Sequence, residues 1–283
     1  MKHYSAAGSV MLLAAALASP LCAAQAGPQA ATTQAGAGNR AYVAQVNSGA
    51  EVTALVIQHG TNNVVGDPAG QSGGVQQSDA EVQVAEVRQT GNANRATLSQ
   101  RGGWRAATGL EQHGNGNIGA VRQDNVSSSV NRIAQAGAGN RVDGVTTDAG
   151  TSGFDAFQTG TGNRIAVVNR NTGYSGPGLT QNGEFNQIAA REEDVAYTTV
   201  NISQVGERNQ VSATWTGTDS VQGTIDQTGA DQAATVHSSA FGSGLRITQT
   251  GARNLATTEQ RGRFQDATIT QDGGNNRGAV VQH

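Results

Sequence analysis

The sequence predicts an all-β fold, a β-solenoid of eleven strand–arc–strand repeats stacked in parallel and in register. Glutamine, followed by glycine two residues later and asparagine three residues after that, recurs eleven times. The spacings between copies are 24, 31, then 23 six times and 22 twice. A constant period of this length is typical of stacked repeats. The chain also has 39 glycines, 4 % aromatic residues and only four prolines, which favours a thin core over an ordinary globular one.

Each repeat is numbered here from its first glutamine, which is position 0. Position 0 is occupied by Gln34, Gln58, Gln89, Gln112, Gln135, Gln158, Gln181, Gln204, Gln227, Gln249 and Gln271. Position +2 is always glycine: Gly36, Gly60, Gly91, Gly114, Gly137, Gly160, Gly183, Gly206, Gly229, Gly251 and Gly273. Position +5 is an amide in every copy: Asn39, Asn63, Asn94, Asn117, Asn140, Asn163, Asn186, Asn209, Gln232, Asn254 and Asn276. Position +11 is glutamine again in Gln45, Gln100, Gln123, Gln260 and Gln282.

The parity of these positions predicts the shape of one repeat. Because side chains alternate along a strand, positions −6, −4, −2 and 0 share one face, and positions +5, +7, +9 and +11 share one face of a second strand. The odd offset between 0 and +5 requires a bend, and glycine at +2 supplies the backbone angles for it. We therefore expect both marked faces to point inward, so that identical amides in neighbouring copies bond along the axis. A buried amide without a partner would cost about 1–3 kcal/mol.

The first residues predict export. Residues 1–24 have the pattern of a cleaved secretory signal peptide, with Lys2 near its start and an apolar run over 10–18 that is too short to span a membrane. Residues 25–33 form a short segment before the predicted repeat domain, 34–283, and no later transmembrane span is predicted. Cys22, the only cysteine, would also suit a lipoprotein anchor, but the bulky Leu21 stands where such an anchor needs a small residue.

Charge and chemistry exclude several functions. Without Lys2 the chain has 17 arginines against 21 acidic residues, a net charge of 17 − 21 = −4, which gives no support for specific nucleic-acid binding. The five histidines form no visible cluster of three or four metal ligands. No repeated carboxylate pair suits acid–base catalysis. We therefore expect that the protein is not an enzyme and that it has no catalytic residues, metal or cofactor.

Arginine often follows the +5 amide and is predicted to point outward. These arginines are Arg40, Arg95, Arg141, Arg164 and Arg277. They are interpreted as a solvated face; the alternative is a stripe that binds acidic polysaccharide or extracellular DNA.

Two copies depart from the pattern. Eight extra residues separate the second and third copies, which predicts a loop insertion near residues 66–78. The seventh copy carries Pro177, which cannot donate to a strand ladder. It also carries a charged run over 191–194 with Glu192 at position +11. Two interpretations of this run remain: a solvated turn, or a gatekeeper against premature aggregation.

The repeat resembles the curlin repeat, Gln-x-Gly-x-x-Asn-x-Ala-x-x-x-Gln. The first copy matches it in full through Gln34, Gly36, Asn39, Ala41 and Gln45. The third copy also matches in full, through Gln89, Gly91, Asn94, Ala96 and Gln100. The wider form of the pattern has serine at position −6, as in Ser129, Ser152, Ser175 and Ser243, with Thr198 as a near match. The resemblance covers residues 28–282, and this chain has more copies than the well-known curlins.

This resemblance implies the subunit of a functional amyloid. Curlins are β-solenoids that Gram-negative bacteria secrete through an outer-membrane pore, and they polymerise at the cell surface into biofilm fibres. We therefore expect a secreted, self-assembling structural protein, with a second curlin subunit, an export pore and chaperones as partners. Solenoids that stay monomeric need polar caps, and none is visible in the repeat pattern. The alternative is a monomeric β-solenoid adhesin, or a fibre nucleator, that binds matrix or host ligands.

Overall fold

The protein is described from a computed structural model of the whole chain. The described residues are 27–49, 51–66, 74–79, 81–170, 173–193, 196–217, 220–239 and 242–283. The predicted signal peptide lies outside these residues.

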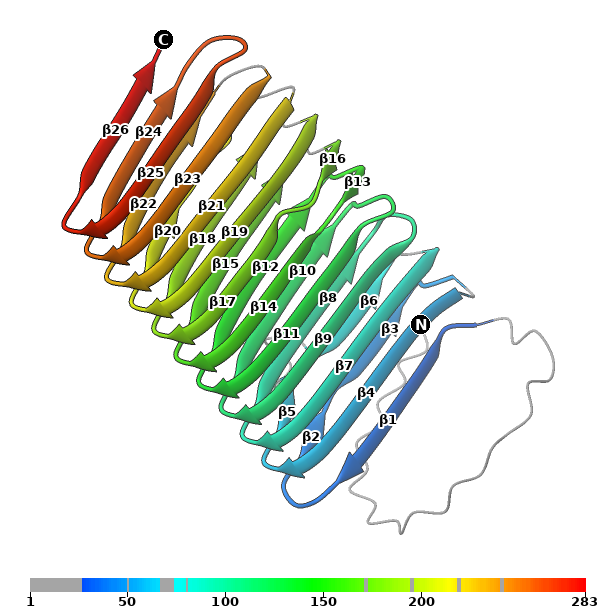
Figure 1. Cartoon of the computed structure of the whole chain (residues 1–283). Coiled ribbons are helices and arrows are strands. Elements are labelled where there is room, and N and C mark those ends of the chain that lie inside the picture. Colours follow the sequence, from blue (N-terminus) through cyan, green and yellow to red (C-terminus); the bar gives the residue numbers. More distant parts are fainter. Residues whose placement is uncertain are drawn as a thin grey trace, which may run out of the picture.

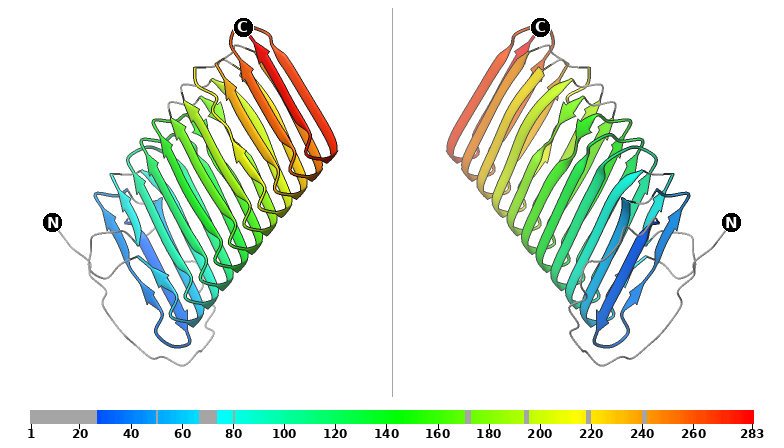
Figure 2. Two further views of the ribbon diagram at one scale, coloured as in Figure 1. Left: turned by 90° about the vertical axis from the view of Figure 1, so that its left-hand side faces the viewer. Right: turned by 90° about the vertical axis from the view of Figure 1, so that its right-hand side faces the viewer.

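Within the described residues the chain forms two long parallel β-sheets and no helix. Each repeat gives one strand to each sheet, and the arcs between them follow one edge of the rod (Figure 1). Every strand pairs with its counterpart in the next repeat, so that Gln34 lies opposite Gln58 and Gln58 lies opposite Gln89. The predicted β-solenoid, stacked in parallel and in register, is confirmed. The side views show the strands stacked along the whole rod, with the described ends at opposite ends of it (Figure 2).

The first sheet contains the strands that carry the position 0 glutamines near their C-terminal ends. In stacking order they are β1 (Gln29–Ala35), β4 (Glu51–Thr61), β7 (Val82–Asn92), β9 (Ala106–Asn115), β11 (Val130–Ala138), β14 (Phe154–Thr161), β17 (Gly178–Glu184), β19 (Tyr197–Glu207), β21 (Ser220–Ala230), β23 (Ser243–Ala252) and β25 (Asp266–Gly274). Two short strands flank this stack, β13 (Thr151–Ser152) and β16 (Tyr174–Ser175).

The second sheet contains the strands that follow the arcs. In stacking order they are β2 (Arg40–Ala41), β5 (Val64–Val65), β8 (Arg95–Arg101), β10 (Ile118–Asp124), β12 (Arg141–Thr147), β15 (Arg164–Arg170), β18 (Gln187–Glu193), β20 (Gln210–Ser212), β22 (Ala233–Ser238), β24 (Leu255–Gln260) and β26 (Arg277–Gln282). Two further strands, β3 (Val43–Val46) and β6 (Val75–Ser78), pair with each other, and β6 also pairs with β8. We call the two strands of one repeat, one in each sheet, together with the arc that joins them, a rung. Rungs are counted from the N-terminus.

The core is the thin layer between the two sheets. Aliphatic side chains fill it between the amide columns, and large residues on one sheet face glycines on the other. A Cβ atom on Gly144 would lie 2.1 Å from the Phe154 ring, and one on Gly119 would lie 2.4 Å from the Leu110 side chain. Each large side chain therefore occupies the space that a glycine leaves free, which keeps the layer evenly filled.

The insertion between the second and third rungs is shorter than the sequence predicts. Residues 75–78, expected as part of a loop near 66–78, form β6 and pair in parallel with Val43–Val46 and with residues 98–101 of β8. The chain returns here to the inward pattern, because Val75 and Gln77 are fully buried. Residues 67–73 lie outside the described residues.

Candidate functional site: the inner amide ladders and the end rungs

The position 0 glutamines form an unbroken hydrogen-bonded column. In each of the ten steps from Gln34 to Gln271 the Nε2 of one glutamine donates to the Oε1 of the next, at 2.6–2.9 Å. From the second rung onward, each Nε2 also donates to the backbone oxygen at +6 of the preceding rung, at 3.0–3.3 Å. One interior amide therefore links its own rung to both neighbouring rungs and to the second sheet, and both of its donor hydrogens are used.

The +5 column joins the rungs through the backbone as well as the side chains. Asn63 N donates to Asn39 Oδ1 at 2.9 Å, and the Asn39 Nδ2 donates to the Gly60 oxygen at 2.9 Å. The same backbone bond recurs at most of the following rungs. At the ninth rung Gln232 takes this position; its Nε2 reaches the Gly251 oxygen at 2.9 Å, but its buried Oε1 has no partner.

The arc requires glycine at +2 for two independent reasons. The φ angles of these glycines lie between 94° and 127°, a region that other residues rarely adopt. In the first ten rungs, an added Cβ would also lie 1.8–2.1 Å from the carbonyl oxygen of the next +2 glycine. Gly273 in the last rung is the exception. The atom nearest to a Cβ added there is Asn276 Nδ2, at 3.9 Å.

A second special position in the arc, +4, was not predicted from the sequence. All eleven residues at +4 have positive φ, between 53° and 70°, the left-handed helical region. The sequence signal was present, because seven of the eleven are glycine, asparagine or aspartate: Gly38, Asn62, Gly116, Gly139, Gly162, Asp231 and Asn275. The other four are Ala93, Phe185, Arg208 and Arg253.

The +11 column is complete only towards the two ends of the rod. Gln45, Gln77, Gln100 and Gln123 form three successive Nε2 to Oε1 bonds of 2.8–2.9 Å. Gln260 donates to Gln282 at 3.1 Å. Gln77 was missed because the insertion shifts it off the +11 count, although it stands 23 residues before Gln100. Between these two ends the column holds Thr146, Asn169, Glu192, Trp215 and Ser238, all buried.

Glu192 is not in a solvated turn, and this corrects one of the two sequence interpretations. It lies on the inward face of β18, fully buried, and the Ser175 hydroxyl donates to its carboxylate. Its Oε1 has no hydrogen-bond partner. Burial away from water raises the pKa of Glu192 to about 7, and the Ser175 bond only partly opposes this. Its neighbours Arg191 and Glu193 point outward and form an ion pair.

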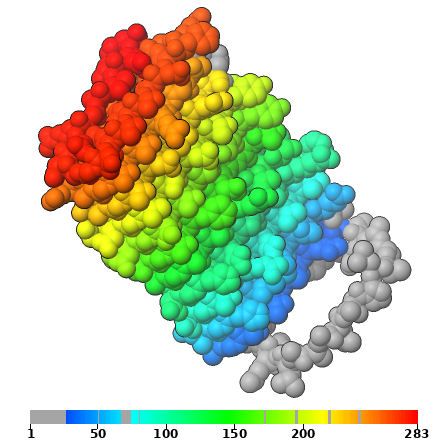
Figure 3. Space-filling model, in the orientation of Figure 1, coloured from blue at the N-terminus to red at the C-terminus, as the bar shows by residue number. Residues whose placement is uncertain are grey.

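The end rungs leave part of the amide columns open to solvent. At the first rung every residue of β1 is exposed, Gln34 included, and at the last rung Asn276 and Gln282 are only half-buried. Figure 3 shows the rungs as consecutive bands across one face of the rod, from the first rung to the last. At these ends the described residues provide no further rung for the Gln271 Nε2 or the Asn276 Oδ1 to bond.

The arginines that follow the +5 amides lie on the outer face of the second sheet. Arg40, Arg95, Arg141, Arg164 and Arg277 are exposed, as expected, and Arg141 forms an ion pair of 2.5 Å with Asp143 on the same strand. Within the described residues no three His, Cys, Asp or Glu side chains lie close enough together to hold a metal ion. The described part of the chain also contains no helix that is long and apolar enough to cross a membrane.

Comparison with known families matches the last two rungs. Residues 251–283 match the curlin associated repeat. The matched stretch runs from position +2 of the tenth rung to the end of the eleventh, and it includes both arc glycines and the inner amides of the two rungs except Gln249. No curated protein matches the chain. The other rungs repeat the same amide and glycine columns as the matched stretch.

Proposed function

We propose that this protein is a structural subunit that assembles head to tail into a curli-like extracellular fibre. One observation carries the proposal. At each end rung, inner amides are partly exposed and one edge of each sheet is open. Exposed strand edges readily pair with a further strand. A second copy would extend both sheets and all three amide columns.

The bonds of the interior rungs define how two copies would meet. If the first rung of one copy follows the last rung of another, Gln271 Nε2 would donate to Gln34 Oε1. The Asn39 backbone N–H would donate to Asn276 Oδ1, as Asn63 does to Asn39 at 2.9 Å within the chain. The Asn276 side-chain amide would likewise reach the Gly36 oxygen. Two identical ends cannot reproduce these bonds, because the strands would then run antiparallel, so the ladder favours one polarity.

The amides named from the sequence take their proposed role from this geometry. The position 0, +5 and +11 amides would carry self-assembly, and the +2 glycines would shape the arc that presents them. Leaving a buried amide without a partner costs about 1–3 kcal/mol. Each junction therefore gains by satisfying amides that a free end leaves open or hydrated.

The remaining parts of the proposal concern export and location. Residues 1–24 would direct secretion and be removed, residues 25–33 would precede the solenoid, and the fibre would form at the surface of a Gram-negative cell. There it would serve adhesion and biofilm formation. A second curlin subunit, an outer-membrane pore and chaperones are the proposed partners, on the basis of the curlin repeat.

The test is fibre formation by the purified chain without residues 1–24. After removal of denaturant, the chain is expected to form thioflavin-positive fibres. Their diffraction should show the two spacings of stacked strands and packed sheets, ~4.7 Å and ~10 Å. A chain that remains a folded monomer for days at micromolar concentration would overturn the proposal. That outcome would favour the monomeric adhesin instead.

A further inference from the structure

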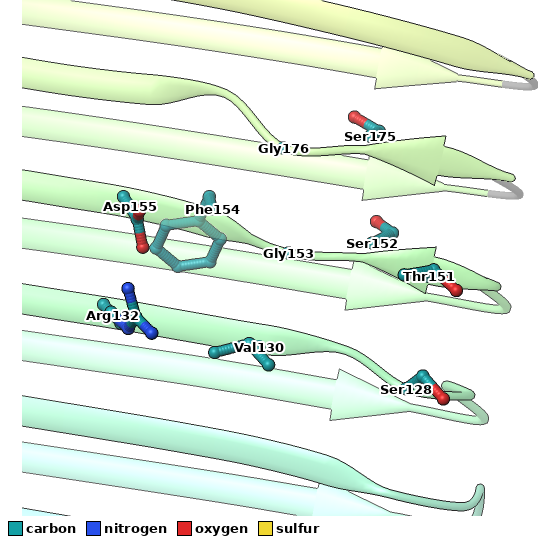
Figure 4. Close-up of a pocket in the computed structure, with 10 residues that line it drawn as sticks. All are labelled: Ser128, Val130, Arg132, Thr151, Ser152, Gly153, Phe154, Asp155, Ser175 and Gly176. Carbon is teal, nitrogen blue, oxygen red and sulfur yellow. The ribbon is translucent and has the colours of Figure 1, made fainter.

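The outer face of the first sheet carries a shallow hollow across the fifth to seventh rungs. It encloses about 280 Å³ and is open to solvent. Figure 4 shows Arg132 and Asp155 at one end of it, Ser128 and Thr151 at the other, and Gly153 and Gly176 between them. This volume is near the lower end for ligand pockets, about 300–1,000 Å³, which suits a small chemical unit.

Glycines of successive rungs leave the middle of the hollow without side chains. Gly153 and Gly176 both occupy position −5, and Gly178 occupies position −3 beside them. A Cβ on Gly153 would lie 1.8 Å from the Val130 oxygen, so this glycine is required by the backbone. A Cβ on Gly176, in contrast, would meet nothing within 4 Å. The open space above Gly176 is therefore not imposed by packing.

The polar end of the hollow presents two opposite charges. Arg132 and Asp155 are register partners in β11 and β14. Among the described residues, however, neither side chain takes part in an ion pair or a side-chain hydrogen bond. Both groups remain open to a ligand.

An exposed aromatic pair stands beside the hydroxyl end. Tyr174 and Tyr197 stack with ring centroids 5.3 Å apart and planes within 4°. They are 56 % and 60 % exposed, which is unusual for two large rings in contact. In the preceding rung the register partner of Tyr174 is the short Thr151, which lines the hollow. Tyr197 thus covers one side of the Tyr174 ring, and the rung on its other side places Thr151 at the register position of Tyr174.

We propose that this hollow binds a neutral hexopyranose unit of a polysaccharide. A pyranose ring has an apolar face of C–H groups, which is attracted to the electron-rich face of a tyrosine ring. Its hydroxyls both donate and accept, so one sugar can donate to the Asp155 carboxylate and accept from the Arg132 guanidinium. The glycine floor lets the ring approach the sheet closely. The hollow thus combines an apolar platform with a few convergent polar groups, as small-molecule sites do.

The same features disfavour other ligands. Asp155 would repel a phosphate or a uronate next to Arg132, and the mature chain carries a net charge of 17 − 21 = −4. The hollow is too small and too polar for an acyl chain. The site is also independent of the end rungs, so binding and fibre formation can fail separately.

The proposal is tested by calorimetric titration of the mature chain with cellohexaose, maltohexaose and chitohexaose. At least one of these neutral oligosaccharides is expected to bind. Gly176→Val fills the open space and is expected to weaken binding by about tenfold or more, and Tyr174→Ala by about tenfold. Gln222→Val is the matched control, because Gln222 occupies the same position −5 in the ninth rung, two rungs beyond Gly176, and is exposed on the first sheet. It is expected to leave binding unchanged.

Two results would overturn the proposal. One is that none of the three oligosaccharides binds, or that Gly176→Val and Gln222→Val bind equally well. The other is that an acidic oligosaccharide, tested as hexagalacturonate, binds more tightly than the neutral ones and does so through Arg132. Circular dichroism and fibre formation of each variant confirm that the fold is intact, so a loss of binding reports on the hollow itself.

Discussion

A Cβ atom on Gly251 would lie 2.0 Å from the carbonyl oxygen of Gly273. This close approach repeats along the arc and stops at Gly273 itself, which faces no further rung within the described chain. Glycine at this position therefore serves the fold in ten rungs, and at the eleventh we expect it to serve the junction between copies.

Replacing Gly273 with alanine is expected to block assembly while leaving the chain folded. The positive φ of Gly273 costs alanine about 1–3 kcal/mol, but its Cβ contacts nothing closer than 3.9 Å within the chain. In a fibre the same Cβ would collide with the Gly36 oxygen of the next copy. Thioflavin kinetics and circular dichroism measure the two effects separately.

Gly251→Ala is the control for this substitution. Its φ of 107° is similar to the 94° of Gly273, but its Cβ would collide within the chain, so it is expected to destabilise the fold by at least about 2 kcal/mol more. If Gly273→Ala assembled at the wild-type rate, head-to-tail stacking through this rung would be wrong.

Removing one rung's inner amides is expected to slow assembly and to lower stability. Gln135→Ala with Asn140→Ala breaks the Gln112–Gln135 and Gln135–Gln158 bonds, at 2.8 and 2.9 Å, and the Asn163 N–H bond to Asn140. Each buried group left unpaired costs about 1–3 kcal/mol. The denaturation midpoint and the fibre elongation rate should both fall.

The comparison variant is Arg141→Ala, which removes an exposed ion pair with Asp143. Such pairs contribute less than about 1 kcal/mol, so it should behave like the wild type. Equal effects of the inner and outer substitutions would contradict the assignment of the two faces.

Replacing Gln232 with asparagine is expected to stabilise the rod. Asparagine occupies this column in the other ten rungs, where its Oδ1 typically accepts the next backbone N–H, as Asn254 does from Asn276 at 3.0 Å. The longer glutamine leaves its buried Oε1 without a partner. Restoring the shorter amide should raise the free energy of unfolding by about 1 kcal/mol, measured by denaturant titration. No gain, or a loss, would mean that the ninth rung has adapted its packing to glutamine.

Glu192 is expected to make stability depend on pH. Burial raises its pKa from an ordinary value of 4.5 to about 7. Below pH 4.5 the group is protonated in both the folded and the unfolded chain, and its burial carries no charge penalty. Between pH 4.5 and 7 the unfolded chain releases the proton first, so the free energy of unfolding falls as pH rises. The loss is complete above pH 7 and amounts to roughly 3 kcal/mol.

Glu192→Gln should remove this dependence and stabilise the protein at pH 8. Denaturation midpoints from pH 4 to pH 8 measure it, with Glu193→Gln as the outward-facing control. A wild-type curve that runs parallel to the Glu192→Gln curve across this range would show that Glu192 titrates normally and is not buried in solution.

The repeat pattern was sufficient to predict the solenoid and the inner columns. An odd offset between two amides forces a bend, alternation fixes which residues face inward, and a constant period places like residues opposite each other. These are local properties, so Gln34 and Asn39 could be assigned inward positions from one repeat. Position +4 could have been recognised in the same way, because its glycines, asparagines and aspartate mark positive φ.

The tertiary structure decided what no single repeat contains. Gln77 joins the +11 column because stacking, and not sequence count, sets its neighbour across an insertion. Glu192 is buried because the inward parity of β18 continues through it, with Ser175 of the other sheet as its partner. The hollow forms because Arg132, Gly153 and Gly176, which come from three successive repeats, lie together on one face. The sequence by itself determined the rung, because a rung depends on residues near one another in the chain. The stack determined the contacts between rungs and between sheets, because those depend on which residues face each other across about 5 Å between rungs and about 10 Å between sheets.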